Sequence, residues 1–185
     1  PELTYAEACE LAYFGAKVIH PQTMAPAIAR NIPIRIRNTF NPTHPGSTIS
    51  ATASREPPVK GTTVIGRLAL VSVEGAGMIG VPGTAERVFA ALHRAGISVV
   101  MISQGSSEHS ICCVVGEADA ARAVDELREA FARELARGQI ADVAAEPGIS
   151  VLAVVGDGMA GTPGIAARLF DALARARVNV RAIAQ

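Results

Sequence analysis

The sequence predicts an α+β fold in which a βαββαβ unit is preceded by a smaller helix-and-strand segment and followed by a shorter copy of itself. Three observations support this fold class. Short apolar stretches with the alternation of strands are interleaved with amphipathic stretches of helical period. One strand–helix–strand stretch recurs 81 positions later in the chain. A stretch rich in proline and small residues separates the duplicated part from what precedes it.

The first fifty residues are expected to form a segment of their own. Thr4 and Glu7 have the spacing of a capping box, and apolar residues follow at helical intervals, so a helix is expected up to about Gly15. A second short helix is expected over residues 21–30. Residues 32–38 place isoleucine at alternate positions, which predicts a strand with one buried face.

Residues 51–62 are expected to be a linker, and residues 63–146 the first duplicated unit. The periodicity there predicts the order strand, helix, strand, strand, helix, strand. The predicted ranges are 67–75, 82–96, 97–103, 110–115, 117–139 and 140–145. In the long second helix the residues expected to face the core are Val124, Leu127, Phe131 and Leu135.

The second copy is expected over residues 147–185. Between residues 75–104 and 156–185, 16 of 30 positions are identical. Both stretches contain a glycine-rich turn, a helix and a strand, and they end on Gln104 and Gln185. We expect the second copy to be truncated, because nothing in it matches residues 105–145.

The glycine-rich turn has the G-x-G-x-x-G spacing that is associated with dinucleotide binding. Three features argue against that function. The helix is expected to begin at Pro82, after the motif rather than within it. No acidic residue occurs at positions 95–104, where a ribose-binding carboxylate is expected. The second strand is followed by a short loop and a third strand, whereas a dinucleotide-binding fold needs a crossover helix there.

Two other interpretations of this turn stay open. Its backbone amides and the helix dipole favour a carboxylate, as in a free amino acid whose ammonium is held by nearby carbonyls. Alternatively, the glycines only permit a tight turn between strand and helix.

Composition excludes several classes of partner. Lysine plus arginine and aspartate plus glutamate number 17 each without a basic cluster, so neither nucleic acid nor an anionic membrane is an expected partner. No apolar stretch approaches the roughly 18 residues of a membrane span, and no signal peptide is visible. Cys9, Cys112 and Cys113 lack metal-ligand spacing, so we expect free thiols in a reducing cytoplasm and no metal site.

The pattern G-M-x-G-x-P-G-x-A-x-R-x-F occurs at the start of both duplicated helices, and in this βαββαβ order it resembles tandem ACT domains. These are ferredoxin-like regulatory modules that bind amino acids. FGAKVIHPQT, IPIRIRNTFNP and PGSTI resemble the C-terminal end of the α/β catalytic domain of aspartate kinase. ISQGSSEHSI and AIAQ resemble its threonine-sensitive branch, which is often fused to homoserine dehydrogenase. The resemblance covers essentially the whole chain and assigns residues 1–50 to the kinase domain.

The resemblance implies the feedback-regulated part of a kinase that phosphorylates L-aspartate with ATP and Mg, in the biosynthesis of lysine, threonine and methionine. Lys17 and Val18 match positions that contact ATP. No catalytic residue and no tightly bound cofactor are expected in this segment, because the other nucleotide- and aspartate-binding motifs are missing. Effector contacts are expected at Gly77, Met78, Gly80, Val81, Pro82, Gly83, Gln104, Ser106 and Gln185.

L-Threonine is the expected effector and lysine the alternative. A glutamine carboxamide both donates and accepts hydrogen bonds, which suits the threonine hydroxyl, and Val100 stands where lysine-sensitive relatives carry an aspartate. A homodimer through the ACT domains is expected, with effector sites at the interface. An ACT pair of another amino-acid biosynthetic enzyme and a dinucleotide-binding oxidoreductase remain as alternatives.

Overall fold

A computed structural model describes residues 1–104 and 109–184 of the chain. The chain divides into two compact units. We call Pro1–Ile65 with Val151–Asn179 the flanking unit, and Gly66–Ser150 with the described residues from Val180 on the central unit. The boundaries fall within two long strands, β4 (Gly61–Glu74) and β7 (Asp142–Val155), so each of these strands contributes residues to both units.

The central unit contains a four-stranded sheet in the order β5-β6-β4-β7. Its other elements are η1 (Ala76–Met78), α3 (Thr84–Arg94), β5 (Val99–Gln104), β6 (Ser110–Gly116), η2 (Glu117–Asp119), α4 (Ala120–Ala130) and α5 (Ala132–Ala136). Strand β6 pairs antiparallel with both β4 and β5. This order of elements confirms the predicted α+β fold.

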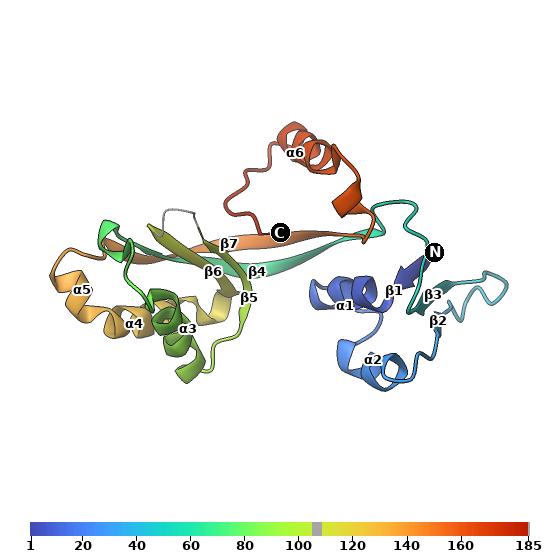
Figure 1. The fold of residues 1–185 in the computed structure, drawn as a ribbon, viewed down its shortest axis with the longest axis horizontal. Coiled ribbons are helices and arrows are strands. Elements are labelled where there is room, and N and C mark those ends of the chain that lie inside the picture. Colours follow the sequence, from blue (N-terminus) through green and yellow to red (C-terminus); the bar gives the residue numbers. More distant parts are fainter. Residues whose placement is uncertain (105–108, 185) are drawn as a thin grey trace. The chain divides into compact units, whose positions relative to one another are not determined.

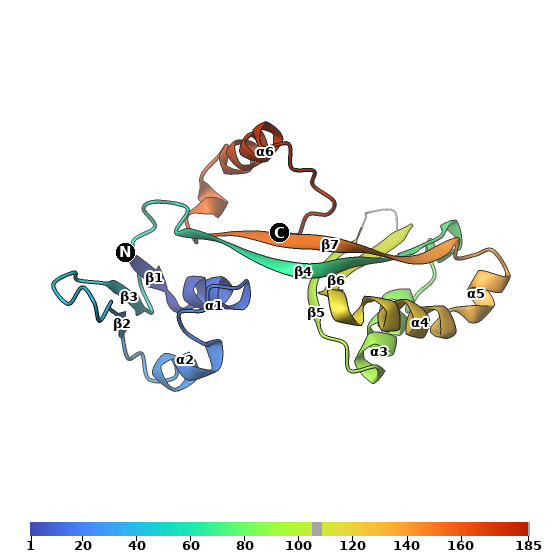
Figure 2. The ribbon, with the colours of Figure 1, turned by 180° about the vertical axis from the view of Figure 1, so that it is seen from behind.

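The core of the central unit lies between the sheet and its helices. Helices α3, α4 and α5 lie on one face of the sheet (Figures 1 and 2). Along β4 the side chains alternate, since Val71 and Val73 are buried whereas Glu74 is exposed. The helices add apolar side chains to the same cluster: Val88, Ala91 and Leu92 from α3, and Ala123 and Leu127 from α4.

The predicted long helix over residues 117–139 is interrupted. Phe131 lies between α4 and α5 with φ −114° and ψ 21°, outside the helical region, and its side chain is only 1% exposed. The chain therefore leaves helical geometry at a residue whose ring is still in the core. The predicted inward positions are confirmed, because Leu127 and Phe131 are buried in the core and Val124 and Leu135 pack against it.

The flanking unit contains a three-stranded sheet in the order β1-β3-β2. Its elements apart from β4 and β7 are β1 (Glu2–Thr4), α1 (Tyr5–Tyr13), α2 (Pro21–Ile28), β2 (Ile34–Ile36), β3 (Ser47–Ser50), η3 (Met159–Gly161) and α6 (Ile165–Arg175). The predicted capping box at the start of α1 is present. Tyr5, Ala8, Met24 and Ile49 form the centre of the apolar cluster that joins α1, α2 and the sheet.

The predicted last strand of the second copy is not formed. Residues 178–184 have no strand assignment. In the first copy the equivalent strand β5 is held by β6, and no element within the described residues plays that part for residues 178–184. Instead, the Ser103 hydroxyl donates to the carbonyl of Ile183 at 2.9 Å, and Arg181 pairs with Glu146.

Candidate functional site

The first glycine turn, residues 75–83, connects β4 to α3. Several of its amides donate within the protein. The Gly75 amide donates to the His109 carbonyl at 3.0 Å, and the Gly77 amide to the Gln139 carbonyl at 2.9 Å. The Met78 amide donates to the Gly75 carbonyl at 3.1 Å. The turn is therefore held in a fixed shape by backbone hydrogen bonds.

Packing explains two of the glycines in the motif. A Cβ on Gly75 would lie 2.3 Å from the Gln139 carbonyl oxygen, and a Cβ on Gly77 would lie 2.5 Å from the Gln139 Cβ. Both positions therefore need glycine because the segment leading into β7 passes so close. Gly83, the N-cap of α3, is glycine for another reason, since its φ of 86° is left-handed.

Three backbone amides near the first turn have no hydrogen-bond acceptor among the described residues, and they lie at the start of the turn and at the start of α3. The first amides of α3, those of Thr84 and Ala85, have no acceptor within the helix, and the N-cap Gly83 has no side chain to offer one. Within the described residues, the Ala76 amide likewise makes no hydrogen bond. The helix begins at Thr84, two residues beyond the predicted start at Pro82, with Gly83 as its N-cap. It still begins after the glycine motif, as predicted, so its dipole is available to a carboxylate just beyond the motif.

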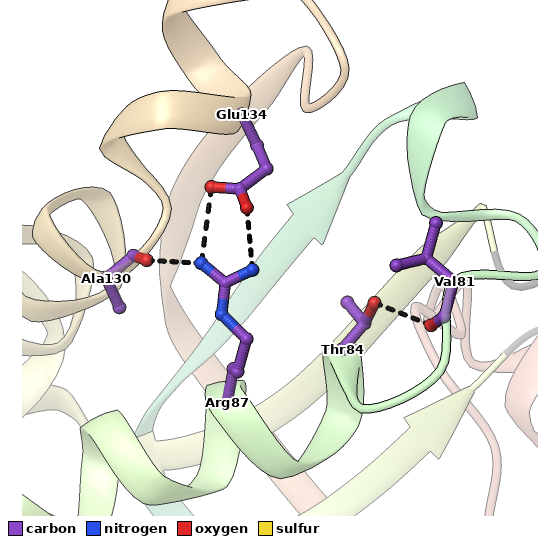
Figure 3. A network of polar contacts seen from close by, with 5 residues as sticks. All are labelled: Val81, Thr84, Arg87, Ala130 and Glu134. Carbon is purple, nitrogen blue, oxygen red and sulfur yellow. Dashed lines mark hydrogen bonds and ion pairs between the residues drawn. The ribbon is translucent and has the colours of Figure 1, made fainter.

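Side-chain contacts fix the orientation of α3 (Figure 3). The Thr84 hydroxyl donates to the Val81 carbonyl at 3.1 Å. One turn further on, the Arg87 guanidinium donates to both carboxylate oxygens of Glu134, at 2.6 and 3.2 Å, and to the Ala130 carbonyl at 2.7 Å. These bonds tie the first turns of α3 to the α4–α5 junction.

Arg87 also lies over an aromatic ring, with its Cζ 4.4 Å from the centroid of Phe131. The hydrogen bond between the two side chains lowers the pKa of Glu134 and raises that of Arg87. Both groups are therefore charged at neutral pH, and the pair is a bidentate ion pair.

The second glycine turn, residues 156–164, repeats this construction. A Cβ on Gly156 would lie 2.1 Å from the Pro58 carbonyl oxygen, as one on Gly75 would meet Gln139. The Lys60 amide donates to the Val155 carbonyl at 2.8 Å, and in the first copy the Ala141 amide donates to Glu74 at 2.7 Å. The segment before β4 thus packs against the second turn and donates a backbone hydrogen bond to the strand that precedes it. The segment before β7 makes the same contacts at the first turn.

One amide of the second turn contacts a carboxylate. Asp157 is equivalent to Ala76 in the duplication, and its amide donates to Glu7 Oε1 at 2.8 Å. The duplicated turn therefore includes one example of a carboxylate oxygen bound by the amide at this position. The sequence indicated Glu7 only as part of the capping box with Thr4, and it did not indicate the Ala76 amide as a donor, because a backbone amide leaves no signal in the residue type.

Gln104 ends its strand at the same end of the sheet as the first turn. Ile111 of β6 pairs with Val73 on one side and with Gln104 on the other. Since neighbouring strands lie about 4.8 Å apart, Gln104 lies roughly 10 Å from the end of β4. Gln104 is exposed.

The other residues predicted to bind ligands differ in accessibility. Gly77, Gly80, Val81, Pro82 and Gly83 are exposed. Met78, also predicted to contact the effector, is only 3% exposed, and its side chain packs in the core beneath the turn. Ser106 and Gln185 lie outside the described residues.

Lys17 and Val18 lie between α1 and α2 and are exposed. One exposed cation does not make a binding site for ATP and Mg, which needs phosphate clamps and metal ligands. Among the described residues, no group of three His, Cys, Asp or Glu side chains could hold a metal ion. The same part of the chain has no helix long and apolar enough to cross a membrane.

Comparison with known sequences identifies relatives for the whole chain. The family model of the ACT domain matches residues 71–131 and 152–185, which together make up just over half of the chain. Over 99% of its length the chain is 48% identical to bifunctional aspartokinase/homoserine dehydrogenase 1 of Arabidopsis thaliana, and it covers 21% of that protein. Over 100% of its length it is 49% identical to the bifunctional enzyme of Haemophilus influenzae, of which it covers 23%. The chain thus spans about a fifth of these relatives.

Solved structures share the fold over the whole chain. The aspartate kinase of Clostridium acetobutylicum is 25% identical with a TM-score of 0.82, and the match covers 100% of this chain and 42% of that one. Aspartokinase III of E. coli in complex with lysine and aspartate is 27% identical with a TM-score of 0.69, covering 100% of this chain and 40% of that one.

Proposed function

Because the chain belongs to the ACT domain family and is similar along its length to part of the bifunctional aspartokinase/homoserine dehydrogenases, we propose that it is the regulatory region of a threonine-sensitive aspartate kinase. The observation that carries this proposal is the set of donors at the first turn. The amides of Ala76, Thr84 and Ala85 lie beside the N-terminus of α3 without an internal acceptor among the described residues.

The second turn supports a carboxylate as the ligand of these donors. There the amide equivalent to that of Ala76 donates to a carboxylate oxygen at 2.8 Å. A free amino acid presents the same chemical group, and the helix dipole adds about 0.3–1 kcal/mol for a negative charge at the N-terminus of α3. We place the effector carboxylate at Ala76 and Thr84, with Gly80 to Gly83 forming the wall of the site.

We propose L-threonine as the effector because of Gln104. Its carboxamide is exposed at the same end of the sheet as the turn, and it can pair with a hydroxyl as both donor and acceptor. Val100 offers no charge to the ammonium of a lysine side chain. Ser106 and Gln185 complete the proposed contact set.

The parent reaction, transfer of a phosphoryl group from ATP to L-aspartate, is proposed for a longer protein that contains this chain. Among the described residues no group of side chains could hold a metal ion, and Lys17 alone cannot clamp the phosphates of ATP, so we assign this chain no catalytic step. We propose residues 1–50 as the end of the kinase domain, with Lys17 and Val18 near its nucleotide, 51–62 as linker, 63–146 as the first ACT domain and 147–185 as the second. A cytoplasmic homodimer through the ACT domains completes the proposal.

Calorimetry with L-threonine, L-lysine and L-methionine tests the effector assignment. We expect saturable heat with L-threonine and a weaker response with the other two. Gln104→Leu should weaken threonine binding about tenfold, because the proposed hydrogen bond between the carboxamide and the threonine hydroxyl is lost. Gln22→Leu, on the exposed surface of α2, is the matched control and should leave binding unchanged. Tighter binding of L-lysine would contradict the assignment.

A further inference from the structure

Glu7 is the one charged side chain that is buried among the described residues, with 1% exposed. It lies in the first turn of α1, where its Oε2 accepts from the Thr4 amide at 2.8 Å and the Thr4 hydroxyl oxygen accepts from the Glu7 amide at 3.1 Å. This capping box uses only one of its two carboxylate oxygens. A buried carboxylate is tolerated only when its oxygens are hydrogen-bonded, so the partner of the second oxygen matters.

The second oxygen binds a residue 150 positions further along the chain. Oε1 of Glu7 accepts from the Asp157 amide at 2.8 Å, and the Thr4 hydroxyl donates to Asp157 Oδ2 at 2.9 Å. Asp157 lies in the second glycine turn, within the same compact unit as α1. Two hydrogen bonds thus join the first turn of α1 to this turn.

The backbone of the second turn is held in place from the other side. A Cβ on Gly158 would lie 2.6 Å from the Arg55 carbonyl oxygen, and one on Gly156 would lie 2.1 Å from that of Pro58. The Asp157 amide is therefore presented to Glu7 by a turn that has little room to move. In the first turn the equivalent residue is Ala76, which has no carboxylate partner among the described residues.

We propose that the Glu7 carboxylate occupies the second glycine turn in place of an amino-acid carboxylate, by accepting the hydrogen bond of the Asp157 amide. Docking of α1 and binding of a free amino acid at the Asp157 amide then exclude each other, because both need the same donor. An amino acid can occupy the second turn only by displacing Glu7 and releasing α1 from it. The class of competing ligand rests on the function proposed above, whereas the role of Glu7 does not.

Hydrogen exchange of individual amides, followed by NMR on the 185-residue chain, tests the role of Glu7 without any effector. In Glu7→Ala and in the milder Glu7→Gln, which keeps the side-chain volume, the Asp157 amide should exchange at least about tenfold faster. The amides of Gly75 and Gly77 in the first turn should not change. Glu10→Gln, on the same helix, is the control and should alter neither turn. Unchanged protection of Asp157 in both Glu7 variants would overturn the proposal.

A titration with L-threonine tests the competition. In Glu7→Gln the Asp157 amide signal should respond at a threonine concentration at least about tenfold lower than in the unaltered chain, because the acceptor that competes for it has lost its charge. Equal concentrations would overturn the mutual exclusion. If threonine moves no signal in either turn, the proposed effector function fails, and the hydrogen-exchange result still decides the role of Glu7.

Discussion

Arg87 shows how much of this structure depends on single side-chain contacts. It binds Glu134 through two hydrogen bonds, donates to the Ala130 carbonyl and lies over the ring of Phe131. The duplication repeats this arginine as Arg168.

Replacing Glu134 with Gln should destabilise the chain by about 0.5–1 kcal/mol at pH 7. The side chains of Arg87 and Glu134 are 44% and 27% exposed, so solvent screening keeps the contribution small. Because folding lowers the pKa of Glu134, its contribution is present above the ordinary value of about 4.3 and is lost as the pH falls through the folded-state pKa. Urea unfolding at pH 7 and near pH 3 measures this difference.

The control is Glu129→Gln, on the exposed surface of α4. It should change stability by less than about 0.5 kcal/mol at either pH. A difference between Glu134→Gln and the unaltered chain that persists near pH 3 would contradict the ion-pair account.

The three free cysteines should differ in reactivity. Burial, followed by the neighbouring Cys112, raises the pKa of Cys113 to about 11, and burial also raises the pKa of Cys112. At pH 8 a thiol reagent should therefore modify Cys9 and Cys112 well before Cys113, which should react only when the chain unfolds. Mass spectrometry of labelled peptides, with labelling in urea as the control, measures the order. Equal rates for Cys112 and Cys113 in the folded chain would contradict it.

The raised pKa of Cys113 also has a consequence for stability. The folded chain keeps this thiol protonated to a higher pH than the unfolded chain does. Its contribution is thus present below the unfolded value of about 8.5 and is lost as the pH rises towards 11. Cys113→Ala should flatten the decline in unfolding free energy over this range.

At the scale of elements, the first glycine turn packs closely against the segment before β7 and also forms the proposed effector site. Gly77→Ala should destabilise the chain by about 1–3 kcal/mol, because its Cβ would meet both the side chain and the carbonyl of Gln139. Gly161→Ala, where nothing lies within 4 Å and φ is not left-handed, is the control and should be nearly neutral. Thermal unfolding compares the two variants. A neutral Gly77→Ala would show that the close approach to Gln139 does not exist in solution.

The elements that could be predicted from the sequence depend on local signals. The capping box at Thr4 correctly indicates where α1 begins, whereas Pro82 predicts the start of α3 two residues too early. The break at Phe131 could not be predicted, because the spacing of Val124, Leu127, Phe131 and Leu135 is that of one face of a continuous helix. Strands β1 and β3 were missed because they pair with each other across more than forty residues.

The candidate site was predicted only in part. The turn and Gln104 follow from the duplication, but the identity of the donors without an acceptor required the hydrogen bonds of the fold. The expected strand over the last residues was wrong, because a strand pattern is not sufficient where no neighbouring strand binds it.

At the scale of the whole molecule, the duplication gives two glycine turns of similar sequence, residues 75–83 and 156–164, whose amides have different neighbours. In one, the Asp157 amide donates to a buried carboxylate of the same chain, and in the other the equivalent residue, Ala76, is exposed. The account therefore predicts that a small amino acid acts first at Ala76 and only in competition with Glu7 at Asp157.

The most direct measurement is an NMR titration of the ¹⁵N-labelled chain with L-threonine, recorded amide by amide. The account predicts that the signals of Ala76, Thr84 and Ala85 move together and saturate, before any change at Asp157. Signals that stay in place at these three residues while others move, or a response that is the same for L-threonine and for acetate, would contradict it.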